Sequence, residues 1–81
     1  MKERIKFVPT FEVPFQHREP RKVWAALLEM PKGAYWEDDL LTTLKADGVL
    51  NRYLNPKNSF HGILMHLAGM GFIHGFGTAE N

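Results

Sequence analysis

The chain of 81 residues contains no cysteine, so disulfides and thiolate metal ligands are both excluded. It also lacks any apolar run close to the roughly 18 residues that a membrane-spanning helix requires. Its first residues alternate between charged and apolar side chains, which is not the pattern of a signal peptide. From these absences we expect a soluble, cytoplasmic protein that does not enter a membrane.

A strong charge of one sign is missing as well, because ten basic and nine acidic side chains leave a net charge of +1. This balance gives no overall basic field that would indicate nucleic-acid binding. The charges are unevenly distributed, however, since no carboxylate follows Asp47 until Glu80. The basic and histidine side chains of that interval are Arg52, Lys57, His61, His66 and His74. We therefore expect an acidic middle of the chain and a mildly positive C-terminal half.

Motifs of catalysis are scarce. The only serine, Ser59, has no glycine-rich elbow around it, and the glycines fit neither a phosphate-binding loop nor a dinucleotide-binding motif. His61 and His66 are five residues apart, whereas a spacing of four places two imidazoles on one helical face for a metal. We therefore predict that the protein is not an enzyme and uses no metal or other cofactor.

The sequence does contain enough apolar side chains for the core of one small domain. Hydrophobic residues make up 44% of it, including two Trp, two Tyr and six Phe. From the length we expect a single domain, and the composition is that of a folded chain rather than a disordered one.

Residues 55–71 show the clearest secondary-structure pattern, that of a helix with a defined start and end. Asn55 or Asn58 can cap the start, and Pro56 suits the first helical position. Gly71 can adopt the left-handed conformation that ends a helix. This stretch is the organising helix of the predicted fold.

One stripe of that helix is apolar at about 100° per residue and must face a core. It consists of Phe60, Ile63, Leu64 and Leu67. Beyond the helix, Phe72 should pack back on Leu67, and residues 72–76 alternate as a short strand would. We expect the stripe to share one core with Trp24, Leu27, Leu40, Leu44 and Phe72.

The opposite face of the helix is the candidate binding surface. Its centre is Asn58, Gly62, Met65 and Gly69, with His61 and His66 on the two shoulders. A face of two glycines and one methionine suits close approach to an apolar protein surface.

Apolar residues at odd positions near the N-terminus give the period of two that indicates a half-buried strand. They are Ile5, Phe7, Phe11, Val13 and Phe15. Pro9 and Pro14 interrupt them, and proline cannot donate to a strand ladder. The segment is therefore an edge strand, two short pieces or an extended arm, which lies on its own domain or reaches a second subunit.

Between the arm and the organising helix, the pattern predicts a helix over 20–30, a very short strand over 34–36 and a second helix from Glu37 to about Asp47. In the first helix, Leu28 should widen the apolar stripe that faces the core. A short helix is predicted over 49–54 from the apolar repeat of Val49, Leu50, Tyr53 and Leu54. The acidic run at 37–39 could be a metal or catalytic cluster, but carboxylates at the positive end of a helix dipole explain it better.

Three segments resemble the winged helix-turn-helix domain. They are residues 23–28 (VWAALL), 35–41 (YWEDDLL) and 64–73 (LMHLAGMGFI). The resemblance covers residues 20–77 and implies an α+β fold. The expected molecule is a small winged-helix-like domain of three to four helices with a minimal β element, an extended N-terminal arm over 1–19 and a frayed tail over 78–81.

In that family the third helix enters the major groove of DNA, and the hairpin after it touches phosphate or the minor groove. The groove-facing positions implied here are Asn58, Ser59, His61, Gly62, Met65 and His66, with Arg52 and Lys57 near phosphates. The resemblance thus implies a small regulatory protein that binds double-stranded DNA, with dimerisation through the arm as a further expectation.

Two departures from the family keep a second hypothesis open. The sequence ends soon after the first wing strand, so we expect no residues for a full two-stranded wing unless the N-terminal arm supplies the partner strand. The groove-facing side has no arginine or glutamine, and only Asn58 is suited to bidentate contact with a base. The alternative is a protein–protein interaction module, a small inhibitor or adaptor that uses the same helix face to bind a partner protein.

Overall fold

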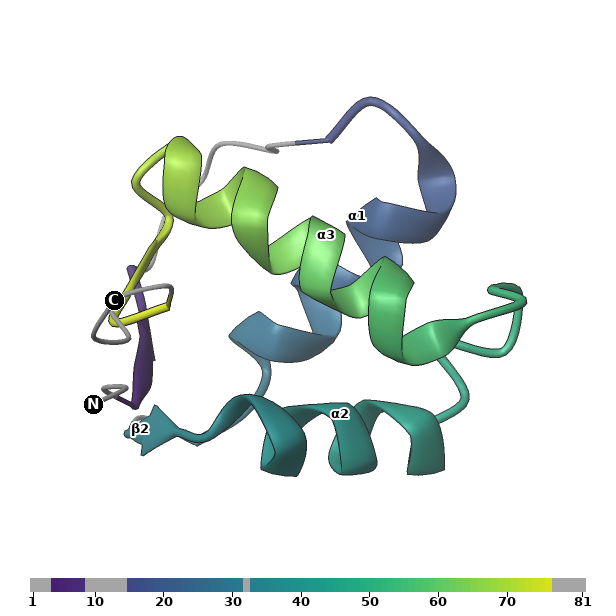
Figure 1. Cartoon of the computed structure of the whole chain (residues 1–81), viewed down its shortest axis with the longest axis horizontal. Helices are drawn as coiled ribbons and strands as arrows, with labels where there is room; N and C mark the ends of the chain where they lie inside the picture. Colours follow the sequence, from purple (N-terminus) through teal and green to yellow (C-terminus); the bar gives the residue numbers. More distant parts are fainter. Residues whose placement is uncertain (1–3, 9–14, 32, 77–81) are drawn as a thin grey trace.

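The computed structural model describes residues 4–8, 15–31 and 33–76. Over this part the chain is a small α+β fold, with elements in the order β1, α1, β2, α2, α3 and β3 (Figure 1). The helices are α1 (Arg18–Leu28), α2 (Glu37–Ala46) and α3 (Pro56–Gly69), and the strands are β1 (Ile5–Phe7), β2 (Ala34–Tyr35) and β3 (Ile73–His74).

The predicted start of α3 is confirmed. Asn55 is the N-cap, and its side-chain Oδ1 accepts a hydrogen bond of 3.3 Å from the backbone N–H of Asn58. Pro56 occupies the first helical position, where its missing N–H has no intrahelical partner to lose. The first turn of α3 is therefore fixed by its own sequence.

The end of α3 also follows the prediction. Gly71 has a positive φ of 85°, and its N–H donates to the carbonyl of Ala68 at 3.1 Å. The N–H of Phe72 donates to the carbonyl of Leu67 at 2.9 Å. These two bonds form a Schellman motif, which turns Phe72 back onto the core and aims the chain into β3.

The eight side chains expected to share one core do so. Trp24, Leu27, Leu40, Leu44, Ile63, Leu64, Leu67 and Phe72 are all buried in one cluster. Trp24 meets Phe72 edge to face, with ring centroids 5.7 Å apart. The cluster also takes in Ile5, Val23, Leu50, Phe60 and Ile73, so every helix and strands β1 and β3 contribute to it.

The three strands form an antiparallel sheet in the order β2-β1-β3. Lys6 is opposite Ala34 on one side and His74 on the other, and Val8 extends the second ladder with an N–H bond of 2.9 Å to the carbonyl of Phe72. The edge-strand alternative is therefore wrong for residues 5–7, which form the central strand. Pro9 lies beyond it, so every N–H of β1 remains available to a neighbouring strand.

Other sequence predictions are corrected in detail. Helix α1 starts at Arg18, inside the segment assigned to the arm, and Leu28 at its last position is 39% exposed instead of facing the core. Phe11 and Val13 of the arm, and the tail 78–81, lie outside the described residues.

The short helix predicted over 49–54 is wrong, because that segment forms consecutive turns. Asn51 N–H donates to the carbonyl of Gly48, and Tyr53 N–H to that of Leu50. Gly48 has a φ of 81° that ends α2, and a residue that precedes a proline, as Asn55 does, avoids the helical region. Too few residues remain between these two points for a helix to nucleate.

Candidate functional site

Helix α3 crosses the molecule over α1, with α2 below it in Figure 1. Its inward stripe is buried, whereas Asn58, Gly62, Met65 and Gly69 on the opposite side are exposed. We call these four residues the α3 face. Met65 at its centre is 58% exposed, a high value for a methionine.

The two glycines of the α3 face leave open space above the helix. A Cβ atom built on Gly62 or on Gly69 would meet no heavy atom within 4 Å. Neither glycine is therefore required by packing among the described residues. A partner could approach the helix backbone closely at both positions.

His61, on one shoulder of the α3 face, is held by two other elements. Its Nδ1 lies 2.9 Å from Oε2 of Glu37 at the start of α2. Its ring lies against Phe76, which follows β3, with ring centroids 5.0 Å apart. This shoulder thus joins α3 to α2 and to the end of the sheet.

His66 occupies the other shoulder, where its ring lies against Phe15 with ring centroids 4.8 Å apart. The two imidazoles therefore reach different elements, as their spacing predicts. Within residues 4–8, 15–31 and 33–76, no three His, Asp or Glu side chains lie together as a metal site would require.

The remaining predicted site residues lie at or near the N-terminal end of α3. Arg52 in the preceding turns and Lys57 in the first helical turn are both exposed. Ser59 is half-buried, at the side of the helix rather than on the α3 face. No acidic residue occupies the first turn of α3, so nothing there offsets the positive end of the helix dipole.

Leu54 was missed by the sequence analysis, which placed it in an apolar helical repeat. It is fully exposed, at 104% of the reference area. A residue before the N-cap usually packs on the fourth helical residue, but that residue here is Ser59, which offers no apolar partner. The absence of a staple partner was a signal in the sequence that Leu54 would be left in solvent.

One carboxylate, that of Glu37, lies beside the His61 shoulder of the α3 face. Glu37, Asp38 and Asp39 fill the first turn of α2, whose N-cap Trp36 provides no side-chain hydrogen bond. They therefore complement the helix dipole as the sequence indicates. Glu37 has a second role that the sequence did not reveal, because it also anchors His61.

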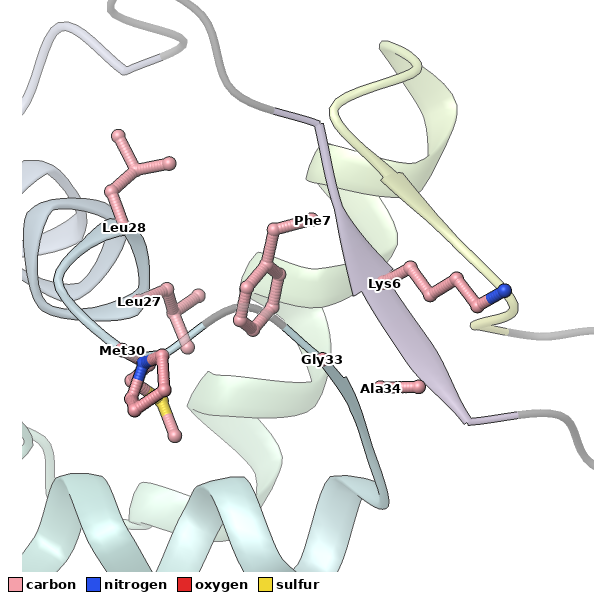
Figure 2. A pocket seen from close by; sticks show the side chains of 8 residues that line it. Lys6, Phe7, Leu27, Leu28, Met30, Gly33 and Ala34 are labelled. Atoms are coloured by element: carbon pink, nitrogen blue, oxygen red, sulfur yellow. The ribbon is translucent and has the colours of Figure 1, made fainter.

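An apolar cavity of about 670 Å³ lies elsewhere, between the end of α1 and β1 (Figure 2). Its lining is Lys6, Phe7, Leu27, Leu28, Met30, Pro31, Gly33 and Ala34. Phe7 and Lys6 extend to opposite sides of β1 in Figure 2, so the Lys6 ammonium does not point toward the Phe7 side of the cavity. A ligand site needs a few convergent polar groups among its apolar walls, and the lining residues provide no polar side chain on the Phe7 side.

None of the helices in the described part of the chain is both long enough and apolar enough to cross a membrane.

The best-defined candidate surface of the described residues is the α3 face, together with its histidine shoulders and the exposed residues at the start of α3. Comparison of the chain with known protein families, with curated protein sequences and with solved structures finds no match.

Proposed function

We propose that the protein is a small regulatory protein that binds double-stranded DNA with the α3 face in the major groove. One observation carries the proposal. The α3 face is uncovered by the rest of the fold, within a stretch from Gly48 to Phe76 that contains no carboxylate. An uncovered helix without acidic side chains is what a polyanionic groove can accept.

Exposed cations lie near both ends of this proposed interface. Arg52 and Lys57 lie at the start of α3, and Arg4 and Lys6 are exposed on or beside β1. Since β1 pairs directly with β3, which follows α3, the N-terminal segment provides the partner strand that a winged-helix arrangement needs. This pairing supports the winged-helix part of the proposal, in which β1 and β3 together take the place of the wing.

Each predicted site residue then has a role in the proposal. Asn58, Gly62 and Met65 face the bases, while Arg52 and Lys57 neutralise phosphates at the entry of the helix into the groove. The shoulders differ from this centre: His61 is oriented by Glu37, and His66 lies beside Phe15. Ser59 is placed to meet the sugar-phosphate backbone at the side of the groove.

A second candidate, binding of a partner protein by the same surface, has its own supporting observation. Leu54, Met65 and Met70 are exposed large hydrophobic residues on or next to α3. The Glu37 carboxylate also lies only 2.9 Å from the His61 shoulder, where a phosphate would be repelled. An apolar surface with a carboxylate at its rim suits a protein with a basic rim.

A duplex titration at two salt concentrations separates the candidates. With two to four phosphate contacts, raising salt from about 50 to about 200 mM should weaken binding roughly 10- to 150-fold, since the slope is near 0.9 per contact. Lys57→Glu should weaken binding to any duplex at low salt. Arg21→Glu is the matched control, because it makes the same charge change at an exposed position of α1.

The outcomes of the titration are distinct. Loss of affinity for Lys57→Glu with unchanged affinity for Arg21→Glu supports binding through α3. Equal losses for both variants indicate a diffuse charge effect and contradict the proposed orientation. If wild type binds no duplex even at about 50 mM salt, the DNA proposal is wrong, because non-specific binders already reach roughly 1–100 μM at the higher, physiological salt concentration, where binding is weaker.

A further inference from the structure

We propose that the α3 face reads A·T base pairs, with Met65 against a thymine methyl group and Asn58 on an adenine edge about three base-pair steps away. This inference rests on the proposed duplex binding and adds a base preference to it. It follows from which side chains the α3 face exposes and which it lacks.

The composition of the α3 face excludes the commonest reading of guanine. Guanine is usually recognised by arginine or lysine on its O6 and N7 atoms, and the α3 face contains neither residue. Its one hydrogen-bonding side chain is the amide of Asn58, and asparagine pairs with the N6 and N7 atoms of adenine. The face is therefore suited to adenine rather than guanine.

Met65 provides the second contact. The thymine methyl is the one apolar substituent among the base edges of the major groove. Met65 is 58% exposed at the centre of the α3 face, with a flexible thioether chain that adapts to an apolar group. Burial against a methyl group would remove apolar surface from water at thymine and at no other base.

The spacing of the two residues matches the spacing of base pairs. Asn58 and Met65 are seven residues apart, so they lie on one face and about 10 Å apart along the axis, at 1.5 Å per residue. This distance corresponds to about three base-pair steps of 3.4 Å. Gly62 lies between them with open space above it, so the helix can approach the bases closely enough for both contacts.

The described residues around them leave the side chains of Asn58 and Met65 unengaged. The backbone N–H of Asn58 is fixed by the Asn55 cap, and its side-chain amide makes no hydrogen bond within the described residues. His61 is drawn to one side by Glu37 at 2.9 Å, while His66 lies against Phe15 on the other. The side chains at the centre of the α3 face are therefore the amide of Asn58 and the thioether of Met65.

Replacing thymine by uracil tests the methyl contact directly, because it removes the methyl group and nothing else. A preferred duplex is first selected from a randomised library, and it should be rich in A·T pairs. The same duplex is then made with uracil in place of thymine. Wild type should bind the uracil duplex about fourfold more weakly for each thymine methyl group that Met65 covers, from the value of one buried carbon group.

Three variants, of which Met70→Ala is the control, assign the effect to residues. Met65→Ala should bind the thymine and uracil duplexes equally, whereas Met70→Ala, at an exposed methionine beyond the end of α3, should discriminate as wild type does. Asn58→Ala should reduce the preference for an A·T over a G·C core by roughly 5- to 150-fold. All three positions are exposed, so the variants should fold, and their thermal melts check this.

The failures are distinguishable. A G·C-rich selected sequence, or a uracil effect that survives in Met65→Ala, overturns this inference while duplex binding stands. Absence of binding to every duplex overturns the proposed function and this inference together.

Discussion

At the scale of single residues, Tyr53 shows most clearly the cost of burying a polar group. Its hydroxyl is buried without a hydrogen-bond partner among the described residues. Burial raises the pKa of Tyr53 above its ordinary value of 10.0, and the nearby charge of Glu19 raises it further. Both effects act against the phenolate, so the folded protein favours a neutral Tyr53.

The raised pKa predicts a pH dependence of stability. Because the pKa is higher in the folded than in the unfolded state, this contribution is fully present below about pH 10 and is lost as pH rises through the folded pKa. Urea unfolding at pH 9 and pH 11 should show a larger loss for wild type than for Tyr53→Phe. At pH 7, Tyr53→Phe should not be destabilised, since the hydroxyl it removes has no partner.

A loss at pH 11 of the same size in both proteins would contradict this assignment to Tyr53. So would a Tyr53→Phe variant less stable than wild type by more than about 1 kcal/mol at pH 7, which would indicate a hydrogen bond to the hydroxyl.

Single residues also show which features the sequence predicts and which depend on the folded structure. The cap at Asn55 and the return at Gly71 depend on neighbours in the chain, so their identities predicted them. The contact between His61 and Glu37 joins residues 24 positions apart, and only the packing of α2 on α3 creates it. Leu54 is exposed because Ser59, the fourth residue of α3, offers it no apolar partner. The sequence could therefore have predicted this exposure.

At the scale of elements, the two ends of α3 were predictable and the segment before it was not. Asn55, Pro56 and Gly71 each favour one local conformation strongly. The apolar residues of 49–54 repeat with the period of a helix. The segment between Gly48 and Pro56 is, however, too short for a helix to form. The apolar repeat therefore predicted the burial of Leu50 correctly, but it predicted a helix where the backbone forms turns.

Two glycines near the end of α3 provide a matched test of its termination. Neither Gly69 nor Gly71 has a neighbour that would meet an added Cβ within 4 Å, and only Gly71 has a positive φ, of 85°. Gly71→Ala should lower the free energy of unfolding by about 1–2 kcal/mol. Gly69→Ala, within the helix, should raise it by about 0.5–1 kcal/mol.

Chemical denaturation of the two variants beside wild type measures both changes. If Gly71→Ala is as stable as wild type, the left-handed end of α3 is not required for the fold. Equal effects of the two substitutions would contradict the distinction drawn from φ.

At the scale of the whole molecule, the N-terminal strand joins the other two strands of the described residues into one sheet. Strands β2 and β3 each pair with β1 and not with one another. Alternation predicted a strand here and its apolar face. Its place between two strands could not be predicted, because it depends on pairing with residues far along the chain and the two prolines argued for an edge.

Adjacent residues of β1 test its structural role. Ile5 is 2% exposed in the core, whereas Lys6 faces the other side of the sheet and is exposed. Ile5→Ala should lower the free energy of unfolding by about 2–5 kcal/mol. Lys6→Ala should change it by no more than about 0.5 kcal/mol, and thermal melts of the two variants should differ accordingly.

A melt that barely moves for Ile5→Ala would show that β1 is dispensable for the core. A large loss for Lys6→Ala would show that its outward assignment is wrong.

The central claim is that the α3 face is the surface that meets duplex DNA, and methionine methyl NMR tests it most directly. Met65 lies at the centre of that face, while Met30 lines the cavity between α1 and β1. In protein labelled at its methionine methyl groups and titrated with duplex at low salt, the Met65 signal should shift with saturation and the Met30 signal should stay in place. A saturating titration that leaves Met65 unmoved would contradict the account.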